Sequence, residues 1–166
     1  RMSGLEILKG SSQIKYGPHI TGGAINYLST PIPDAQETFV KLSYGSFNET
    51  LGHIWTGNVV DMERNGTFGY LFEGFVHRSD GFKTVDAAPG FGATDDTGFT
   101  RFEPMVKAFW EPATPTYQRV EWKYGFTTLE ADETYLGLTD EDFDRDPFRR
   151  YAASRFDHIE TENHRG

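Results

Sequence analysis

The feature that most constrains the fold of this chain is a two-residue alternation of apolar and polar side chains. It is clearest at residues 119–126, where charged residues and a glycine alternate with Val120, Trp122, Tyr124 and Phe126. Period-two alternation places successive side chains on opposite faces of an extended strand. The pattern recurs at residues 40–44, 70–77 and 101–110, and residues 50–60 predict a further strand whose faces the pattern does not assign. The sequence therefore predicts an all-β fold.

Composition excludes several classes of protein. The chain has 166 residues, with 16 Lys and Arg against 25 Asp and Glu, so its formal charge is −9. A nucleic-acid-binding surface needs a basic face, so we expect no nucleic-acid partner. The chain contains no cysteine, which excludes a disulfide framework, a cysteine zinc site and a thiol nucleophile.

The connections between the predicted strands alternate in length. Residues 45–48, 61–66 and 111–115 read as short turns, the second of them with an Asn65-Gly66 turn signal. Residues 79–98 and 128–156 read as long loops. Short turns at one end and long loops at the other are typical of outer-membrane β-barrels. A soluble β-sandwich also alternates faces, and this alternative stays open.

Two details favour the membrane. Large aromatic residues lie near the strand ends, as they do in the aromatic girdles of membrane barrels: Trp110, Trp122, Tyr124 and Phe126. The opposite faces carry full charges of both signs, as a wet lumen would: Lys41, Glu73, Arg101, Glu103, Lys107, Arg119, Glu121 and Lys123. Pro104 is awkward for either fold because proline removes a ladder donor.

Residues 5–33 carry a more specific pattern. A short apolar strand precedes a turn at residues 10–12, and a glycine pair leads into a second strand at residues 24–28. The stretch resembles the C-terminal plug signature of TonB-dependent outer-membrane receptors through Glu6, Lys9, Gly10, Tyr16, Gly17, Gly22, Gly23, Ile25 and Asn26. The family often has proline after the first glycine, where this chain has Ser11.

The resemblance implies an architecture. Residues 1–34 would be the C-terminal part of a plug domain, and residues 35–166 the first five to six strands of a plugged antiparallel barrel in the bacterial outer membrane. The chain is then an internal fragment of a longer receptor. Two further stretches are similar to the ferric-citrate branch of the family: residues 16–18 with 30–33, and residues 133–140 with 146–154.

The resemblance also implies a function, which is transport without catalysis. The receptor would take up a ferric chelate, with ferric citrate or a related siderophore as the expected cargo, and would hold no resident cofactor or metal. Energy would come from the TonB-ExbB-ExbD complex, acting on a plug region absent from this chain. A receptor of the same fold for another cargo, such as a cobalamin or a glycan, and a soluble β-rich binding domain stay as alternatives.

Four residues are candidate ligand contacts. His19 follows a Gly-Pro turn near the expected plug apex, and an exposed turn histidine is an equal reading. Arg149 and Arg150 lie in the last long loop and suit an anionic chelate, because guanidinium groups pair well with carboxylates. They also have acidic neighbours at residues 140–146, and pairing with these is the more common role for at least one of them. Arg78, at a strand end, is a weaker candidate.

The acidic run at residues 140–146 is not an EF-hand, because Arg145 and Tyr151 occupy the positions that need glycine and glutamate. We expect a solvated loop there. The five histidines show no metal-ligand spacing, and no serine lies in a nucleophile-elbow context.

Overall fold

The computed structural model describes residues 2–10, 22–132 and 135–166 of the chain. It divides into two compact units, Arg1–Ile32 and Pro33–Gly166. Strands dominate both units and pair almost entirely antiparallel, so the all-β prediction is confirmed. None of the helices in the described ranges is long and apolar enough to cross a membrane.

The first unit contains a two-stranded antiparallel sheet. Strand β1 (Met2–Lys9) pairs with β2 (Gly23–Ser29), with Lys9 opposite Gly23 at one end of the ladder. Beyond this pair, the Gly10 amide donates a hydrogen bond of 3.3 Å to the Gly22 carbonyl. The ladder therefore ends where the two glycine-containing segments meet.

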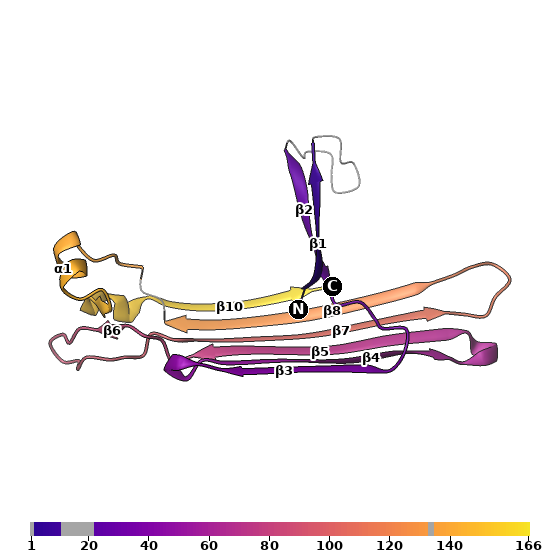
Figure 1. Ribbon diagram of the computed structural model, residues 1–166, viewed down its shortest axis with the longest axis horizontal. Coiled ribbons are helices and arrows are strands. Elements are labelled where there is room, and N and C mark those ends of the chain that lie inside the picture. Colours follow the sequence, from indigo (N-terminus) through magenta and orange to yellow (C-terminus); the bar gives the residue numbers. More distant parts are fainter. Residues whose placement is uncertain (1, 11–21, 133–134) are drawn as a thin grey trace. The chain divides into compact units, whose positions relative to one another are not determined.

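The second unit is built on a six-stranded antiparallel sheet in the order β10-β8-β7-β5-β4-β3 (Figure 1). Neighbours in the sheet follow each other along the chain when the short loop strands are set aside, so the sheet is a meander. Its strands are β3 (Glu37–Tyr44), β4 (Thr50–Asp61), β5 (Thr67–Ser79), β7 (Phe99–Glu111), β8 (Val120–Asp132) and β10 (His158–Arg165).

Register fixes which residues share a face of this sheet. Every aligned pair joins two even or two odd residue numbers, as in Val40 with Ile54 and Phe72 with Val106. Whether a residue number is even or odd therefore tells on which face of the sheet its side chain lies, in every strand from β3 to β10. It also assigns the faces of β4, where Ile54 lies on the even face and His53 on the odd face. Pro104 keeps this register opposite Gly74, while the aligned β7–β8 pairs skip residues 103–104.

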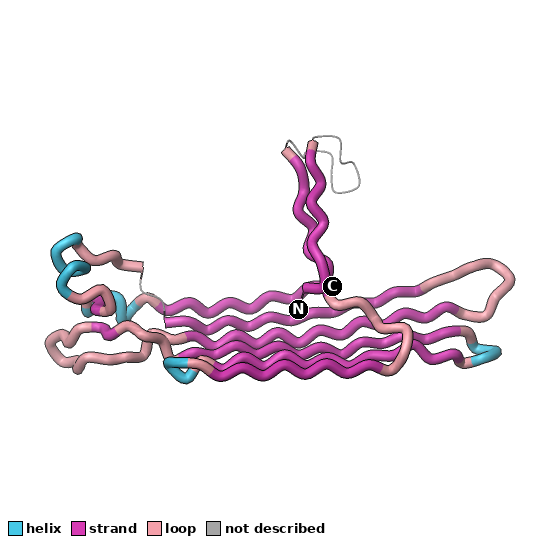
Figure 2. The backbone as a smooth tube through the Cα atoms, in the orientation of Figure 1, coloured by secondary structure: helices cyan, strands magenta, loops and turns pink. Residues whose placement is uncertain are grey.

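Apart from the tight β3–β4 turn, the short turns and the long loops lie at opposite ends of the sheet (Figure 2). At one end are the β4–β5 turn with η3 (Glu63–Asn65) and the β7–β8 turn at residues 112–119. At the other end are the tight β3–β4 turn with η2 (Ser46–Asn48) and the two long loops. The predicted alternation of short turns and long loops is confirmed.

The β4–β5 turn differs in detail from the Asn-Gly prediction. The Met62 amide donates to the Gly66 carbonyl at 2.8 Å, so the turn closes around five residues rather than two. Glu63 and Gly66 have positive φ values of 50° and 91°. A Cβ at Gly66 would lie 1.9 Å from the Glu111 carbonyl oxygen. Glycine is required at this position for two reasons: the end of β7 approaches too closely for a Cβ, and the backbone has a positive φ.

The two long loops carry their own short elements. The first, residues 80–98, contains β6 (Thr84–Val85), which pairs in parallel with β9 (Arg149–Arg150) from the second. The second loop also contains α1 (Asp140–Arg145) and η4 (Ala152–Phe156). The expectation of a solvated loop at residues 140–146 is right about exposure, since all of these residues but Asp142 are exposed, but wrong about conformation, because Thr139 caps a short helix there by accepting a hydrogen bond from the Asp142 amide.

Candidate functional site

The even-numbered residues of the sheet form an exposed apolar face. Leu42 is 78% exposed, Trp122 56% and Phe72 53%. We call this the apolar face, and its large members are Val40, Leu42, Tyr44, Ile54, Val60, Phe68, Tyr70, Phe72, Val76, Phe102, Val106, Trp110, Val120, Trp122, Tyr124 and Phe126. A contiguous exposed apolar surface of this extent is typical of a site that contacts another protein or a membrane.

The odd-numbered residues form the opposite, charged face. They include seven of the charges predicted to share one face: Lys41, Glu73, Arg101, Glu103, Lys107, Glu121 and Lys123. Two acids there are almost fully buried, Glu73 at 4% exposure and Glu103 at 2%. His53 Nε2 lies 2.7 Å from Glu73 Oε1, and the Arg101 guanidinium pairs with the Glu103 carboxylate. The small apolar core lies on this same face, with Leu71, Met105, Phe109 and Ala131.

Arg119, the eighth predicted charge, lies in the turn just before β8. Its Nη1 donates to Glu111 Oε1 at 2.6 Å, and its Nε donates to Glu121 Oε1 at 2.5 Å. The guanidinium also lies 3.8 Å above the centre of the Phe109 ring. Arg119 therefore ties the β7–β8 turn to the charged face.

The β1–β2 hairpin brings together the described residues of the predicted plug signature. Lys9 lies opposite Gly23 and Ile7 opposite Ile25. Asn26 Nδ2 donates to Glu6 Oε2 at 2.9 Å across the ladder. Gly23 has φ +141°, and a Cβ there would lie 2.3 Å from the Leu8 carbonyl oxygen. Tyr16, Gly17 and His19 lie outside the described residues.

Arg149 is held by two acids of the same loop cluster. Its Nε donates to both carboxylate oxygens of Asp86, at 3.1 and 2.9 Å, and its Nη1 donates to Asp142 Oδ1 at 2.8 Å. The hydrogen bond with Asp86 is the main reason that the pKa of Arg149 is raised above its ordinary value. The pairing with residues 140–146 that the sequence suggested is present, and Asp86 is a further partner from the other long loop.

Asp142 is the centre of this cluster. It accepts a 2.5 Å hydrogen bond from the Tyr151 hydroxyl through Oδ2, in addition to the contact with Arg149. The Tyr151 hydrogen bond is the largest cause that lowers the pKa of Asp142, and the positive charge of Arg149 lowers it further. Asp142 therefore connects α1 with Arg149 of β9 and with the Tyr151 hydroxyl.

The other two arginine candidates, Arg150 and Arg78, form hydrogen bonds with different partners. Arg150 donates from Nη1 to the carbonyls of Pro147 and Arg149, at 2.8 and 2.5 Å. Arg78, at the end of β5, donates from Nη2 to Asp80 Oδ1 at 3.0 Å, and its side chain is 58% exposed. The structure brings Arg149 and Arg150 together in β9 but does not gather the three arginines into one cationic site.

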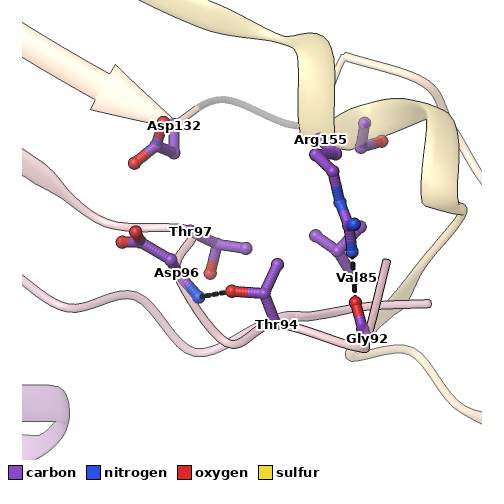
Figure 3. A pocket seen from close by; sticks show the side chains of 8 residues that line it. Val85, Gly92, Thr94, Asp96, Thr97, Asp132 and Arg155 are labelled. Atoms are coloured by element: carbon purple, nitrogen blue, oxygen red, sulfur yellow. Dashed lines mark hydrogen bonds between the residues drawn. The ribbon is translucent and has the colours of Figure 1, made fainter. Parts of the chain in front are cut away.

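An open pocket of about 300 Å³ lies between the two long loops and the end of β8 (Figure 3). It is lined by Val85, Gly92, Thr94, Asp96, Thr97, Asp132, Ser154 and Arg155. A second pocket beside it shares Asp96 and Asp132 and also contains Arg78, Asp80, Glu130 and His158. Acidic side chains therefore predominate where the sequence predicted an anion-binding loop region.

None of Asp86, Asp96, Asp132, Ser154 and Arg155 was a candidate from the sequence. They lie on separate segments without a shared motif, so only the pairing of the loops brings them together. Within residues 2–10, 22–132 and 135–166, no group of three or more His, Asp or Glu residues is arranged to hold a metal ion. No family model, curated protein or solved structure matches the chain.

Proposed function

We propose that the chain is part of a TonB-dependent receptor of the bacterial outer membrane, which imports a ferric chelate such as ferric citrate. In this proposal, unit 2 contributes adjoining strands of the barrel wall, and the β1–β2 hairpin belongs to the plug. The receptor binds its cargo from outside the cell. The TonB-ExbB-ExbD complex then rearranges the plug through a region outside this chain, so the chain performs no catalysis.

The observation that carries this proposal is the distribution of polarity across the sheet. In a soluble protein the apolar face of a sheet is buried and the charged face is exposed. Here the apolar face is exposed, whereas Glu73 and Glu103 on the charged face are buried. Full burial of one large apolar side chain contributes about 1.5–3 kcal/mol. Lipid on the apolar face would therefore stabilise the sheet by tens of kcal/mol, as a rough order of magnitude.

The height of the apolar face supports lipid as the covering phase. On β7 the face runs from Phe102 to Trp110, which is eight residue steps. At about 3.4 Å per residue this is about 27 Å along the strand. A barrel strand tilted by about 40° would give a band about 20 Å tall, close to the roughly 25 Å of outer-membrane barrels. Beyond Phe102, the face becomes polar at Thr100 and Glu130.

The loop arrangement supports an orientation. Outer-membrane barrels have short turns on the periplasmic side and long loops outside the cell. By this rule residues 80–98 and 135–157 are extracellular, and residues 62–66 and 112–119 are periplasmic. The charged face would then line the lumen, where polar side chains contact the plug or the transport route.

A soluble β-rich binding domain is the second candidate. It is favoured by the acidic charge of −9 and the mean hydropathy of −0.56. In that case another protein layer would cover the apolar face. Extraction separates the two candidates, because a protein with a lipid-facing surface needs detergent to leave the membrane fraction.

The test of the transport proposal is uptake of radiolabelled ferric citrate by iron-starved cells that express the complete gene product. Cells with and without TonB are compared, and cells without the gene are the control. The proposal expects uptake that requires both the gene and TonB. If another chelate enters only with TonB, the receptor class stands and ferric citrate is wrong as cargo. If no cargo enters and the protein extracts without detergent, the soluble binding domain is supported instead.

A further inference from the structure

The β4–β5 turn contains the Asn65-Gly66 dipeptide, in which a side chain and the next backbone nitrogen can react with each other. Of the asparagines at positions 26, 48, 58, 65 and 163, Asn65 alone precedes a glycine. In this reaction the backbone nitrogen of the following residue attacks the carbonyl carbon of the asparagine side chain. Glycine hinders the attack least, because it has no side chain and its backbone is the most mobile. The sequence therefore makes Asn65 the most reactive asparagine of the chain.

The structure leaves the Asn65 side chain accessible. Asn65 is exposed at the end of η3, and its side-chain amide has no hydrogen-bond partner in the part of the chain that the structure describes. The side-chain amides of Asn26 and Asn48 instead donate to carboxylates, at 2.9 and 3.1 Å. Asn58 and Asn163 lie inside β4 and β10, where the strand ladders hold the backbone extended. Structure and sequence therefore select the same asparagine.

The peptide group between Asn65 and Gly66 is held at both ends. Its oxygen accepts a hydrogen bond of 3.0 Å from the Trp110 indole Nε1, and its N–H donates to the Glu63 carbonyl at 3.2 Å. The nitrogen of this peptide group can reach the Asn65 side chain only when the group rotates out of this arrangement. Gly66 is also buried, so a base has little access to its amide proton. The reaction therefore requires the turn to open.

We propose that Asn65 is a site of spontaneous deamidation, and that Trp110 limits the rate by holding the turn closed. The Gly66 nitrogen loses its proton to a base and forms a bond to Asn65 Cγ. The Cγ–Nδ2 bond then breaks, and Nδ2 takes up a proton and leaves as ammonia. Water opens the resulting succinimide ring at either carbonyl, which yields aspartate or isoaspartate at position 65. The site is independent of the transport proposal.

Both products change the turn. Each adds a negative charge to a segment that already contains Asp61 and Glu63, and isoaspartate also adds a methylene group to the backbone. The turn has no room for a longer backbone, because a Cβ at Gly66 would already lie 1.9 Å from the Glu111 carbonyl oxygen. Isoaspartate would therefore push the turn away from the end of β7 and break the hydrogen bond from Trp110. Deamidation is thus a chemical ageing step that loosens this end of the sheet.

The test follows deamidation in the complete gene product, held in lipid vesicles at mildly alkaline pH. Samples are digested with pepsin in acid, which suppresses the reaction during digestion. Mass spectrometry measures the extent of deamidation at each asparagine, and electron-transfer fragmentation identifies isoaspartate. Asn65 is expected to react faster than every other asparagine. Trp110→Phe keeps an aromatic ring but removes the indole hydrogen bond, so the rate at Asn65 is expected to rise about fivefold.

Trp122→Phe is the matched control, because the Trp122 ring stacks on Tyr124 and does not hold the turn. Hydrogen exchange of the Gly66 amide reports turn opening, and it should rise in Trp110→Phe while exchange in the middle of β5 stays unchanged. The comparison among asparagines needs only the wild-type protein, so it remains decisive if Trp110→Phe does not fold. Deamidation at Asn65 no faster than at Asn48 overturns the proposal, and so do equal rates in the two tryptophan variants.

Discussion

The Arg149 guanidinium donates from Nε to both carboxylate oxygens of Asp86, across 63 residues of chain. This ion pair lies beside the parallel β6–β9 pairing, so the two long loops are joined by both backbone and side-chain contacts. Charge-assisted hydrogen bonds are stronger than neutral ones, so this pair adds to the backbone hydrogen bonds between the loops.

Asp86→Asn should loosen this connection. The amide keeps the shape of the side chain but removes the charge and one acceptor, so we expect faster hydrogen exchange of the amides at Thr84, Asp86 and Arg149. Exchange within β5 and β7 should not change, because the six-stranded sheet does not use this pair. Asp95→Asn, in the same loop, is the control. Equal exchange in the wild type and Asp86→Asn would show that the loops are held by other contacts.

The loop cluster should also respond to acid. The pKa of Asp142 is lowered, chiefly by the Tyr151 hydroxyl and then by Arg149. A carboxyl group with a lowered folded-state pKa stabilises the fold above its ordinary pKa of about 3.9, and this contribution is lost as the pH falls below that value. We expect α1 and β9 to lose exchange protection below about pH 4, after correction for intrinsic exchange rates.

Asp142→Asn should remove this acid-dependent step, since an amide does not titrate in this range. Asp144→Asn, in the same helix and exposed, should leave the step in place. A step that persists in Asp142→Asn would assign it to another carboxyl group.

The two glycines of the Gly22-Gly23 pair should differ sharply. Gly23 has φ +141° and has no room for a Cβ, whereas a Cβ at Gly22 would meet nothing within 4 Å. Gly23→Ala is expected to destabilise the β1–β2 hairpin by about 1–3 kcal/mol through backbone strain. Gly22→Ala should have little effect. Hydrogen exchange of Leu8 and Ala24 measures both, and equal effects would contradict the backbone explanation.

The sequence predicted the sheet well because alternation is a property of each strand by itself. Residues 119–126 and 101–110 reveal their faces without knowledge of their neighbours. Residues 50–60 did not reveal their faces, because Gly52, Thr56 and Asn58 interrupt the run of apolar residues on one side of that strand. Only the pairing of Ile54 with Val40 and Gly74 assigns it.

The candidate site was less predictable. The acidic neighbours of Arg149 suggested a local ion pair, and Asp142 provides one. The sequence could not predict Asp86 as a partner of Arg149, because no pattern links two loops so far apart in the chain. The same holds for Ser154 and Asp96, whose meeting in one pocket depends on the β6–β9 pairing.

Two histidines on the charged face test how much the burial of an acidic partner contributes to stability. His53 pairs with Glu73, whose side chain is fully buried, and His77 pairs at 2.8 Å with Glu49, whose side chain is 53% exposed. Each imidazole also contacts two phenylalanine rings. The two sites therefore differ mainly in the burial of the acid.

We expect His53→Ala to destabilise the protein by about 1–3 kcal/mol, because it removes a hydrogen bond from a buried carboxylate. His77→Ala should cost less than about 1 kcal/mol, because solvent replaces the exposed partner. Urea-induced unfolding of the complete gene product in lipid vesicles measures the two differences. A larger effect at His77 would mean that ring packing outweighs the burial of the charge.

The apolar face gives the sharpest test of its surroundings. Phe72 lies at the middle of this face, between Thr56 and Val106, and Thr100 lies on the same face near the long loops. In lipid, an arginine costs about 2–4 kcal/mol at the centre of the membrane and about 0–1 kcal/mol near its surface. Phe72→Arg should therefore strongly destabilise the protein in vesicles, and Thr100→Arg should not. In water both positions are exposed, and exposed substitutions change stability by only about 0.5 kcal/mol. A dependence on depth across the face would establish lipid as its neighbour, and equal, small effects would mean that the face meets water.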